Sequence, residues 1–127
     1  MDRHTAQRQA IREVFQAARR PLSPPEVLQR TAARLPQVGQ ATVYRTINRL
    51  LEEGWLRPVL QPGGVTCYEL AGLDHHHHFR CRRCTQVFDI PGCLLGDPRK
   101  RMPQGFKVED HEVWLFGLCQ ACAKAAP

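Results

Sequence analysis

Apolar residues in the first half of the chain recur every three or four positions, a spacing typical of amphipathic helices. The pattern predicts a helix over residues 5–18, with Thr5 as its N-cap. It predicts another helix from about residue 41 to residue 53, followed by Gly54 as a C-terminal cap.

A strong helix start lies between these two segments. Ser23 is followed by two prolines and then by Glu26, so a capping serine, prolines in the first turn and a glutamate that can bond back to the cap occur together. We expect this middle helix to end before Pro36. The chain therefore begins with three predicted helices.

Two short strands are predicted next, at 55–60 and 65–70, and the residues at 61–64 have the composition of a turn. Three helices followed by a two-stranded hairpin is the element order of a winged helix-turn-helix. In that arrangement the third helix lies in the major groove of DNA.

The second half has a different pattern. Short strands are predicted at 76–81 and 85–90, and a short helix or a loop at 92–104. Residues 106–118 alternate between apolar and polar side chains, which predicts one or two further strands.

Residues 71–73 are the expected hinge, so the predicted modules are residues 1–73 and residues 74–127. The chain has 127 residues, 43% of them hydrophobic, which suffices for two small modules with a core. The predicted fold class is α+β, with an N-terminal winged helix-turn-helix and a small C-terminal α/β module.

Charge and hydropathy narrow the function classes. The chain has 18 basic and 12 acidic residues, a net charge of +6, which is compatible with a nucleic-acid partner. No segment approaches the roughly 18 apolar residues of a membrane span, and the N-terminus lacks the apolar core of a signal peptide. We therefore expect a cytoplasmic protein without a membrane partner, and most metabolic-enzyme folds are too large for this chain.

The sequence contains six cysteines and six histidines, which gather in its second half. In a reducing cytosol, clustered cysteines indicate metal binding rather than disulfides. Two C-x-x-C pairs can surround one tetrahedral zinc ion with four thiolates and leave no open position, which indicates a structural site. The predicted ligands are Cys81, Cys84, Cys119 and Cys122. The alternatives are four unrelated buried cysteines or a redox-active pair.

Four consecutive histidines occupy residues 75–78. On a strand their side chains alternate between two faces, so His75 and His77 form one half-site and His76 and His78 another. Further candidate ligands are Glu69, Cys67, His111, Cys93, Asp97, Glu109, Asp110 and Glu112. The alternative is a solvated histidine loop, with Cys67 a buried apolar residue and Glu69 and His111 ordinary surface groups.

The third predicted helix has a basic, aromatic face suited to DNA. Its candidate contacts are Thr42, Tyr44, Arg45 and Arg49, because tyrosine can meet a thymine methyl or a phosphate and arginine can pair with guanine. Candidate phosphate contacts before it are Arg3, Arg8, Arg12, Arg19 and Arg20. The alternative is a solvated helix face.

Taken in order, these features resemble the ferric uptake regulator family. They are the sequence TAQR at 5–8, ATVYR at 41–45, Glu69, the histidine run, the two C-x-x-C pairs and His111. The resemblance runs over nearly the whole chain. It implies a dimeric, metal-activated winged-helix repressor that binds palindromic AT-rich operators, with a C-terminal domain that dimerises by sheet pairing and holds structural zinc on the four cysteines.

By position, the resemblance implies a regulatory site at the hinge, which uses Glu69, His76 and His78, and Cys67 as a candidate ligand. It implies a second site that uses His75, His77 and His111. The regulatory metal is then Zn(II) or Fe(II).

The chain departs from the family pattern at several positions. His77 stands where the family usually has aspartate, and residues 19–23 lack the histidine that many members have there. The glutamate usual on the dimerisation-domain helix has no clear counterpart, and Asp97 or Cys93 is its candidate substitute. Cys67 and the missing histidine favour zinc over iron as the sensed metal.

Three alternatives remain for the function. A peroxide-responsive family member would favour an aspartate at the hinge site. In a zinc-stabilised interaction module, the histidines would have no role in sensing a metal. A small zinc enzyme is disfavoured because neither the H-x-E deaminase signature nor the H-E-x-x-H protease signature is present. We expect no enzymatic activity and no small-molecule substrate.

Overall fold

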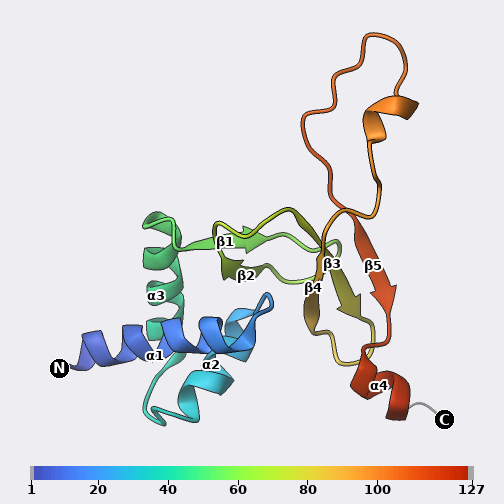
Figure 1. The fold of residues 1–127 in the computed structure, drawn as a ribbon. Coiled ribbons are helices and arrows are strands. Elements are labelled where there is room, and N and C mark those ends of the chain that lie inside the picture. The colour runs from blue at the N-terminus through green and yellow to red at the C-terminus, as the bar shows by residue number, and fades with distance from the viewer. Residues whose placement is uncertain (1, 126–127) are drawn as a thin grey trace. The chain divides into compact units, whose positions relative to one another are not determined.

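The computed structural model describes residues 2–125, and the chain divides into two compact units, residues 1–72 and 73–127 (Figure 1). Each unit has its own sheet. Within the described range, no helix combines the length and apolar character needed to cross a lipid bilayer.

The first unit has the element order of a winged helix. Its elements are α1 (Arg3–Ala18), α2 (Pro24–Ala32), α3 (Gln40–Glu52), β1 (Leu56–Val59) and β2 (Cys67–Leu70). The strands β1 and β2 form an antiparallel hairpin. The predicted three helices and hairpin are confirmed, although both strands are shorter than expected.

A single hydrophobic core joins these elements. Phe15 of α1, Val27 of α2 and Ile47 of α3 are each at most 1% exposed and belong to one cluster that also reaches Leu56 of β1. The apolar spacing read from the sequence places these side chains on the inner faces of the helices. The opposite face of α3 is left for solvent.

The start of α1 corrects one prediction. Asp2, not Thr5, is the N-cap, because the Asp2 carboxylate accepts a hydrogen bond from the Thr5 backbone amide at 2.8 Å. Aspartate is as good a cap as threonine, so the helix begins earlier than the apolar pattern alone indicates.

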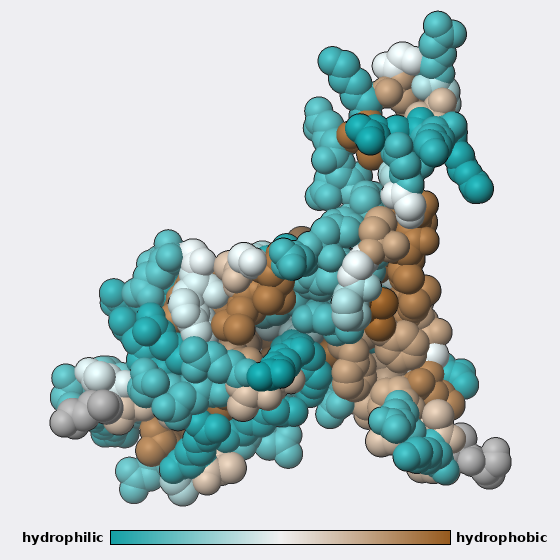
Figure 2. All heavy atoms as spheres, in the orientation of Figure 1, coloured by the Kyte–Doolittle hydropathy of each residue, from teal (hydrophilic) through white to brown (hydrophobic). Residues whose placement is uncertain are grey.

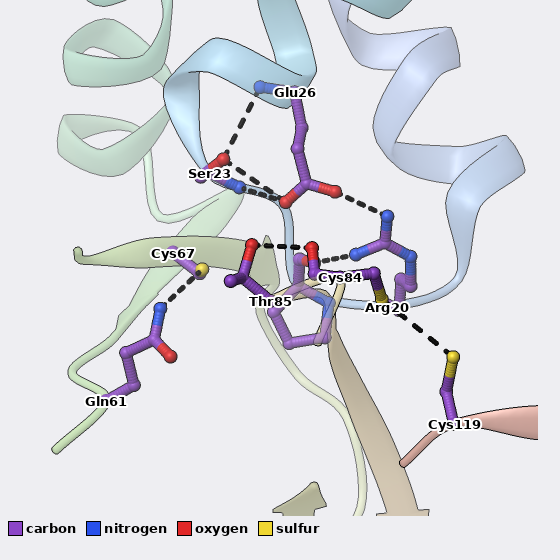
Figure 3. A network of polar contacts seen from close by, with 9 residues as sticks. Arg20, Ser23, Glu26, Gln61, Cys67, Cys84, Thr85 and Cys119 are labelled. Atoms are coloured by element: carbon purple, nitrogen blue, oxygen red, sulfur yellow. Dashed lines mark hydrogen bonds and ion pairs between the residues drawn. The ribbon is translucent and has the colours of Figure 1, made fainter. Parts of the chain in front are cut away.

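The start of α2 is a complete capping box, as predicted (Figure 3). The Ser23 hydroxyl accepts a bond from the Glu26 amide at 3.4 Å, and the Ser23 amide donates to the Glu26 carboxylate at 3.1 Å. The buried Arg20 guanidinium donates to the same carboxylate and to the Pro21 carbonyl. The turn between α1 and α2 is therefore fixed by side-chain bonds.

The second unit is built around a three-stranded sheet in the order β4-β3-β5. Its elements are β3 (His76–Cys81), β4 (Val87–Pro91), the 3₁₀-helix η1 (Pro98–Arg101), β5 (Trp114–Gly117) and α4 (Gln120–Ala125). The strand β3 is antiparallel to β4 and parallel to β5.

Two features of this unit differ from the sequence prediction. The strand predicted within 106–118 is limited to β5, because the preceding segment carries the charged residues Lys107, Glu109, Asp110 and Glu112 and does not pair. The short helix α4 was not predicted, since its small residues show no apolar periodicity. Residues 126 and 127 lie outside the described part of the chain.

The capping box gives a stability prediction. Replacing Ser23 by alanine removes the side-chain acceptor for the Glu26 amide and should lower the free energy of unfolding by about 1 kcal/mol. Urea denaturation followed by circular dichroism measures this. The matched control is Gln29→Ala, an exposed position on the same helix. Equal stability of the two variants would contradict a role for the cap.

Candidate metal centres

The four cysteines of the C-x-x-C pairs converge in the second unit. Their sulfur atoms all lie within 4.8 Å of one another, and the Cys84 and Cys119 sulfurs are 3.8 Å apart (Figure 3). Four thiolates bound to zinc at the usual bond length form a tetrahedron with an edge of about 3.8 Å. The cluster therefore suits a closed structural zinc site.

Local backbone geometry brings these sulfurs together. Cys81 ends β3 and Cys84 lies in the turn toward β4, while Cys119 follows β5 and Cys122 lies on α4. Because β3 runs parallel to β5 and turns into β4 at Cys81, all four cysteines gather at the same end of the sheet.

The thiols of this cluster have strongly perturbed acidities. Hydrogen bonds from the backbone amides of Cys119, Cys84 and Arg83 lower the pKa of Cys81 to about 5. Burial, together with the neighbouring cysteine sulfurs, raises the pKa of Cys122 to about 12. Several thiolates cannot coexist here without a cation, and a zinc ion supplies that charge.

Alternation along β3 sorts the histidine run onto two faces. His75, which immediately precedes the strand, and His77 lie with His111 and Cys93 in one cluster whose ligand atoms are within 4.8 Å of one another. The His75 Nε2 is 3.3 Å from the His77 Nε2 and 3.1 Å from the His111 Nε2. The Cys93 sulfur is 3.3 Å from the His111 Nε2.

The electrostatic environment of this cluster favours neutral imidazole. His77 is 1% exposed, and its burial lowers its pKa, with further lowering from the neighbouring His75 and His111. A neutral imidazole is the form that binds a metal.

The other face of β3 carries a second cluster. The Nε2 atoms of His76 and His78 lie 3.4 and 3.3 Å from the same Asp89 carboxylate oxygen. The His76 Nδ1 is 2.7 Å from the Asp74 carbonyl, which can only accept, so Nδ1 carries the proton and the Nε2 lone pair points to the cluster. Two imidazoles and a carboxylate in this geometry can hold a divalent transition metal.

Asp89 was missed by the sequence reasoning, although the sequence contained a signal for it. The C-x-x-C turn fixes the register of the β3–β4 hairpin, with the Cys81 amide bonded to the Gln86 carbonyl. Counting back along both strands places Asp89 directly opposite His78. Cys93 was predicted as one of several candidate ligands and, with Asp97, as a substitute for the family's glutamate, and residue spacing alone did not choose between these two.

Glu69 and Cys67 belong to β2 in the first unit. Glu69 is 2% exposed and pairs with Arg57, its cross-strand neighbour, at 2.6 Å. The Cys67 sulfur lies 3.5 Å from the Gln61 side-chain nitrogen, and burial raises the Cys67 pKa to about 11 (Figure 3). Among the described residues, Cys67 belongs to none of the clusters of candidate ligands.

The predicted DNA contacts lie on the outer face of α3. Tyr44 is 42% exposed, Arg45 and Arg49 are exposed, and the Arg45 guanidinium donates to the Thr42 hydroxyl at 3.3 Å.

The basic residues around α1 differ in whether their charged groups are exposed and so able to contact DNA phosphates. Arg8 and Arg12 form partly exposed ion pairs with Glu53. Arg20 is buried and bonded to Glu26, so its prediction as a phosphate contact is wrong.

Comparison with known proteins gives a consistent result. Residues 2–116 match the model of the ferric uptake regulator family. The ferric uptake regulation protein of Bacillus subtilis is 33% identical, over 93% of this chain and 83% of its own length.

Solved structures agree with this match. The ferric uptake regulator from Francisella tularensis with iron has a TM-score of 0.72 and 24% identity, over 92% of this chain and 91% of that chain. FurB from M. tuberculosis, a zinc uptake regulator, has a TM-score of 0.53 and 27% identity, over 94% of this chain and 95% of that chain. The chain therefore belongs to the ferric uptake regulator family, whose members are metal-responsive transcriptional regulators and not enzymes.

Proposed function

We propose that this protein is a metal-dependent transcriptional repressor of metal homeostasis, which binds palindromic AT-rich operators as a homodimer when its regulatory site holds Zn(II) or Fe(II). The observation that carries the proposal is the presence of two histidine clusters in addition to the four-cysteine cluster. A protein that needed zinc only for structure would have no use for them. Because the four cysteines require reduced thiols, we place the protein in the cytoplasm.

In this proposal Cys81, Cys84, Cys119 and Cys122 hold the structural zinc. The support is the separation of their sulfurs and the lowered pKa of Cys81. These residues would then keep the second unit folded while the other sites gain and lose metal.

The regulatory site in this proposal consists of Glu69, His76 and His78, to which we add Asp89. The support for Asp89 is its contact with both imidazoles. The support for Glu69 is its burial as a carboxylate on β2, and its position in the family pattern. Cys67 stays a candidate ligand, but its raised pKa disfavours the thiolate form that binds metal.

Ligands from both units would make this site a link across the hinge. A metal that binds one arrangement of the two units more tightly than the others shifts the protein toward that arrangement. A 100-fold preference corresponds to a coupling free energy of about 2.7 kcal/mol. The arrangement so favoured would be the one in which both α3 helices of a dimer match two half-sites on the same DNA face.

The DNA interface in this proposal is the outer face of α3, with Thr42, Tyr44, Arg45 and Arg49. Its support is the exposure of Tyr44, Arg45 and Arg49, with Thr42 half-buried beside them, on the third helix of a winged helix. Arg8 would add a phosphate contact if it left its weak pairing with Glu53.

Members of the family bind DNA and act as dimers. In this chain β5 lies at the edge of the sheet, and its side chains Leu115 and Phe116 are 41% and 52% exposed. Figure 2 shows hydrophobic side chains gathered over this strand. An apolar edge strand is a surface that a second copy can cover by sheet pairing, so we propose β5 as part of the homodimer interface.

The hinge proposal is tested by replacing Glu69 or Asp89 with alanine. Each change removes one metal ligand and should reduce a 100-fold metal-dependent gain in operator affinity to less than tenfold. The measurement is fluorescence anisotropy of a labelled AT-rich palindrome, with free Zn(II) or Fe(II) buffered and salt fixed. The control is Glu112→Ala, an exposed acid outside the cluster. Unchanged metal dependence in both ligand variants would contradict the proposal.

The structural zinc is tested by Cys119→Ser. The variant should bind one zinc less per chain, and the second unit should melt about 10 °C lower, because metal binding and folding are coupled. The chain has two tryptophans, so Trp114 reports on the second unit alone once Trp55 is replaced by phenylalanine. Gln120→Ala, at an exposed position between Cys119 and Cys122, is the control. If Cys119→Ser kept full zinc content, the four-thiolate assignment would be wrong.

The DNA face is tested by Arg45→Ala, which should weaken operator binding about tenfold to 100-fold. Arg30→Ala is the matched control, since Arg30 is exposed on α2 and outside the proposed interface. Anisotropy at several salt concentrations separates a lost phosphate contact, which lowers the salt dependence, from a lost base contact. Equal affinities of the two variants would remove α3 from the interface.

A further inference from the structure

We propose that His75, His77, Cys93 and His111 form a four-coordinate site of three imidazoles and one thiolate, which takes Zn(II) in preference to Fe(II) or Mn(II) and fastens the base of the loop between β4 and β5. This inference deepens the proposed function, because it assigns a metal class and a mechanical role to the second site. Its new element is Cys93.

The distances in the cluster fit a tetrahedral zinc site. Zinc bound at its usual lengths separates two imidazole nitrogens by about 3.3 Å, and an imidazole nitrogen from a sulfur by about 3.6 Å. The His75 Nε2 lies 3.3 and 3.1 Å from the nitrogens of His77 and His111, and the Cys93 sulfur lies 3.3 Å from the His111 nitrogen. Nε2 is the converging nitrogen of all three rings.

Cys93 decides which metal this set prefers. A thiolate is a soft ligand that favours zinc and disfavours the harder ions Fe(II) and Mn(II), which prefer carboxylates. Asp97, the carboxylate alternative, is occupied by Arg99, which donates to it at 2.9 Å from Nε and at 3.1 Å from its backbone amide. Among the described residues, the cluster contains no carboxylate.

The site is reachable from solvent. His75 and Cys93 are exposed, and a surface depression beside the cluster is lined by His75 and His111 together with the acidic residues Glu109 and Asp110 and the paired Asp97 and Arg99. Negative charge at the entrance raises the local concentration of cations.

The four ligands also close a loop. Cys93 lies at the start and His111 near the end of the segment 92–113, which extends away from the three-stranded sheet in Figure 1 and contains only the short helix η1. Its large hydrophobic side chains, Leu94, Leu95, Met102 and Phe106, are exposed, so no core holds it in place. A metal shared by Cys93, His111 and two histidines at β3 would supply the missing restraint.

The first experiment uses Co(II), whose spectrum reports its ligands. Protein with its four-cysteine site filled by zinc receives one further equivalent of Co(II). We expect the strong visible bands of tetrahedral cobalt and a near-ultraviolet band from a cobalt–thiolate bond. Cys93→Ser should lose the thiolate band and bind Zn(II) at least tenfold more weakly, whereas Gln104→Ala, at an exposed position in the same loop, should retain both properties. Zn(II) should displace the cobalt, while equal free concentrations of Fe(II) or Mn(II) should not.

The second experiment tests the role in the loop. Arg99, Lys100 and Arg101 are exposed trypsin sites in the segment. Filling the site with Zn(II) should slow cleavage there at least tenfold in the parent protein, and much less in Cys93→Ser. Because Cys93 is exposed, its replacement leaves the buried residues of the unit in place.

Three results would overturn the inference: a cobalt spectrum without a thiolate band, an unchanged spectrum in Cys93→Ser, or equal protection of the loop in both proteins. Measuring whether operator affinity depends on metal distinguishes a failure of the Cys93 site from a failure of the proposed repressor function. Suppose that Cys93→Ser loses the cobalt–thiolate band and the protection against trypsin, but the parent protein binds DNA equally well with and without metal. The Cys93 site is then supported and the regulatory proposal is contradicted. If the spectrum fails while operator binding stays metal-dependent, only this inference falls.

Discussion

The register of β3 between its two neighbours is the constraint on which the candidate sites depend. Hydrogen bonding fixes His78 opposite Asp89 on β4 and beside Trp114 on β5. Because side chains alternate along a strand, this one alignment separates the four histidines into two pairs. It also brings His111, three residues before Trp114, to His75. A slip of one residue would exchange the faces and disperse both clusters.

The second unit relies on ligands where the first relies on apolar packing. Among the described residues beyond Gly72, the fully buried apolar side chains are Cys81 and Val87, and His77 is buried with them. The first unit, by contrast, has a continuous core drawn from all three helices and the hairpin. A small unit with so few buried apolar groups needs another source of stability, and metal binding provides one. We therefore expect folding and metal content to be coupled in this unit.

The sequence predicted the elements that local rules control. The capping box at Ser23, the apolar faces of the helices and the strand around Cys81 all follow from residue type and spacing. Asp2 was missed as a cap because two suitable residues stood near the helix start. Asp89 was missed because its role depends on the pairing of β3 with β4, which becomes visible only when the register is counted from the C-x-x-C turn. Cys93 was one of several candidate ligands, and the path of the loop, which residue spacing does not encode, is what places it beside His111. The hydrogen bond from Arg20 to Glu26 was likewise not predicted, because it depends on the path of the turn between α1 and α2.

If β3 serves two separate metal sites in addition to the four-cysteine site, each chain has room for three metal ions. The most direct measurement is the number of zinc ions bound per chain, by metal analysis after equilibration with buffered Zn(II). The three clusters predict three ions for the parent protein and two for each of the double variants H75A/H77A and H76A/H78A. If either double variant lost both ions together, or if the parent bound a single ion, the histidines would not form two independent sites.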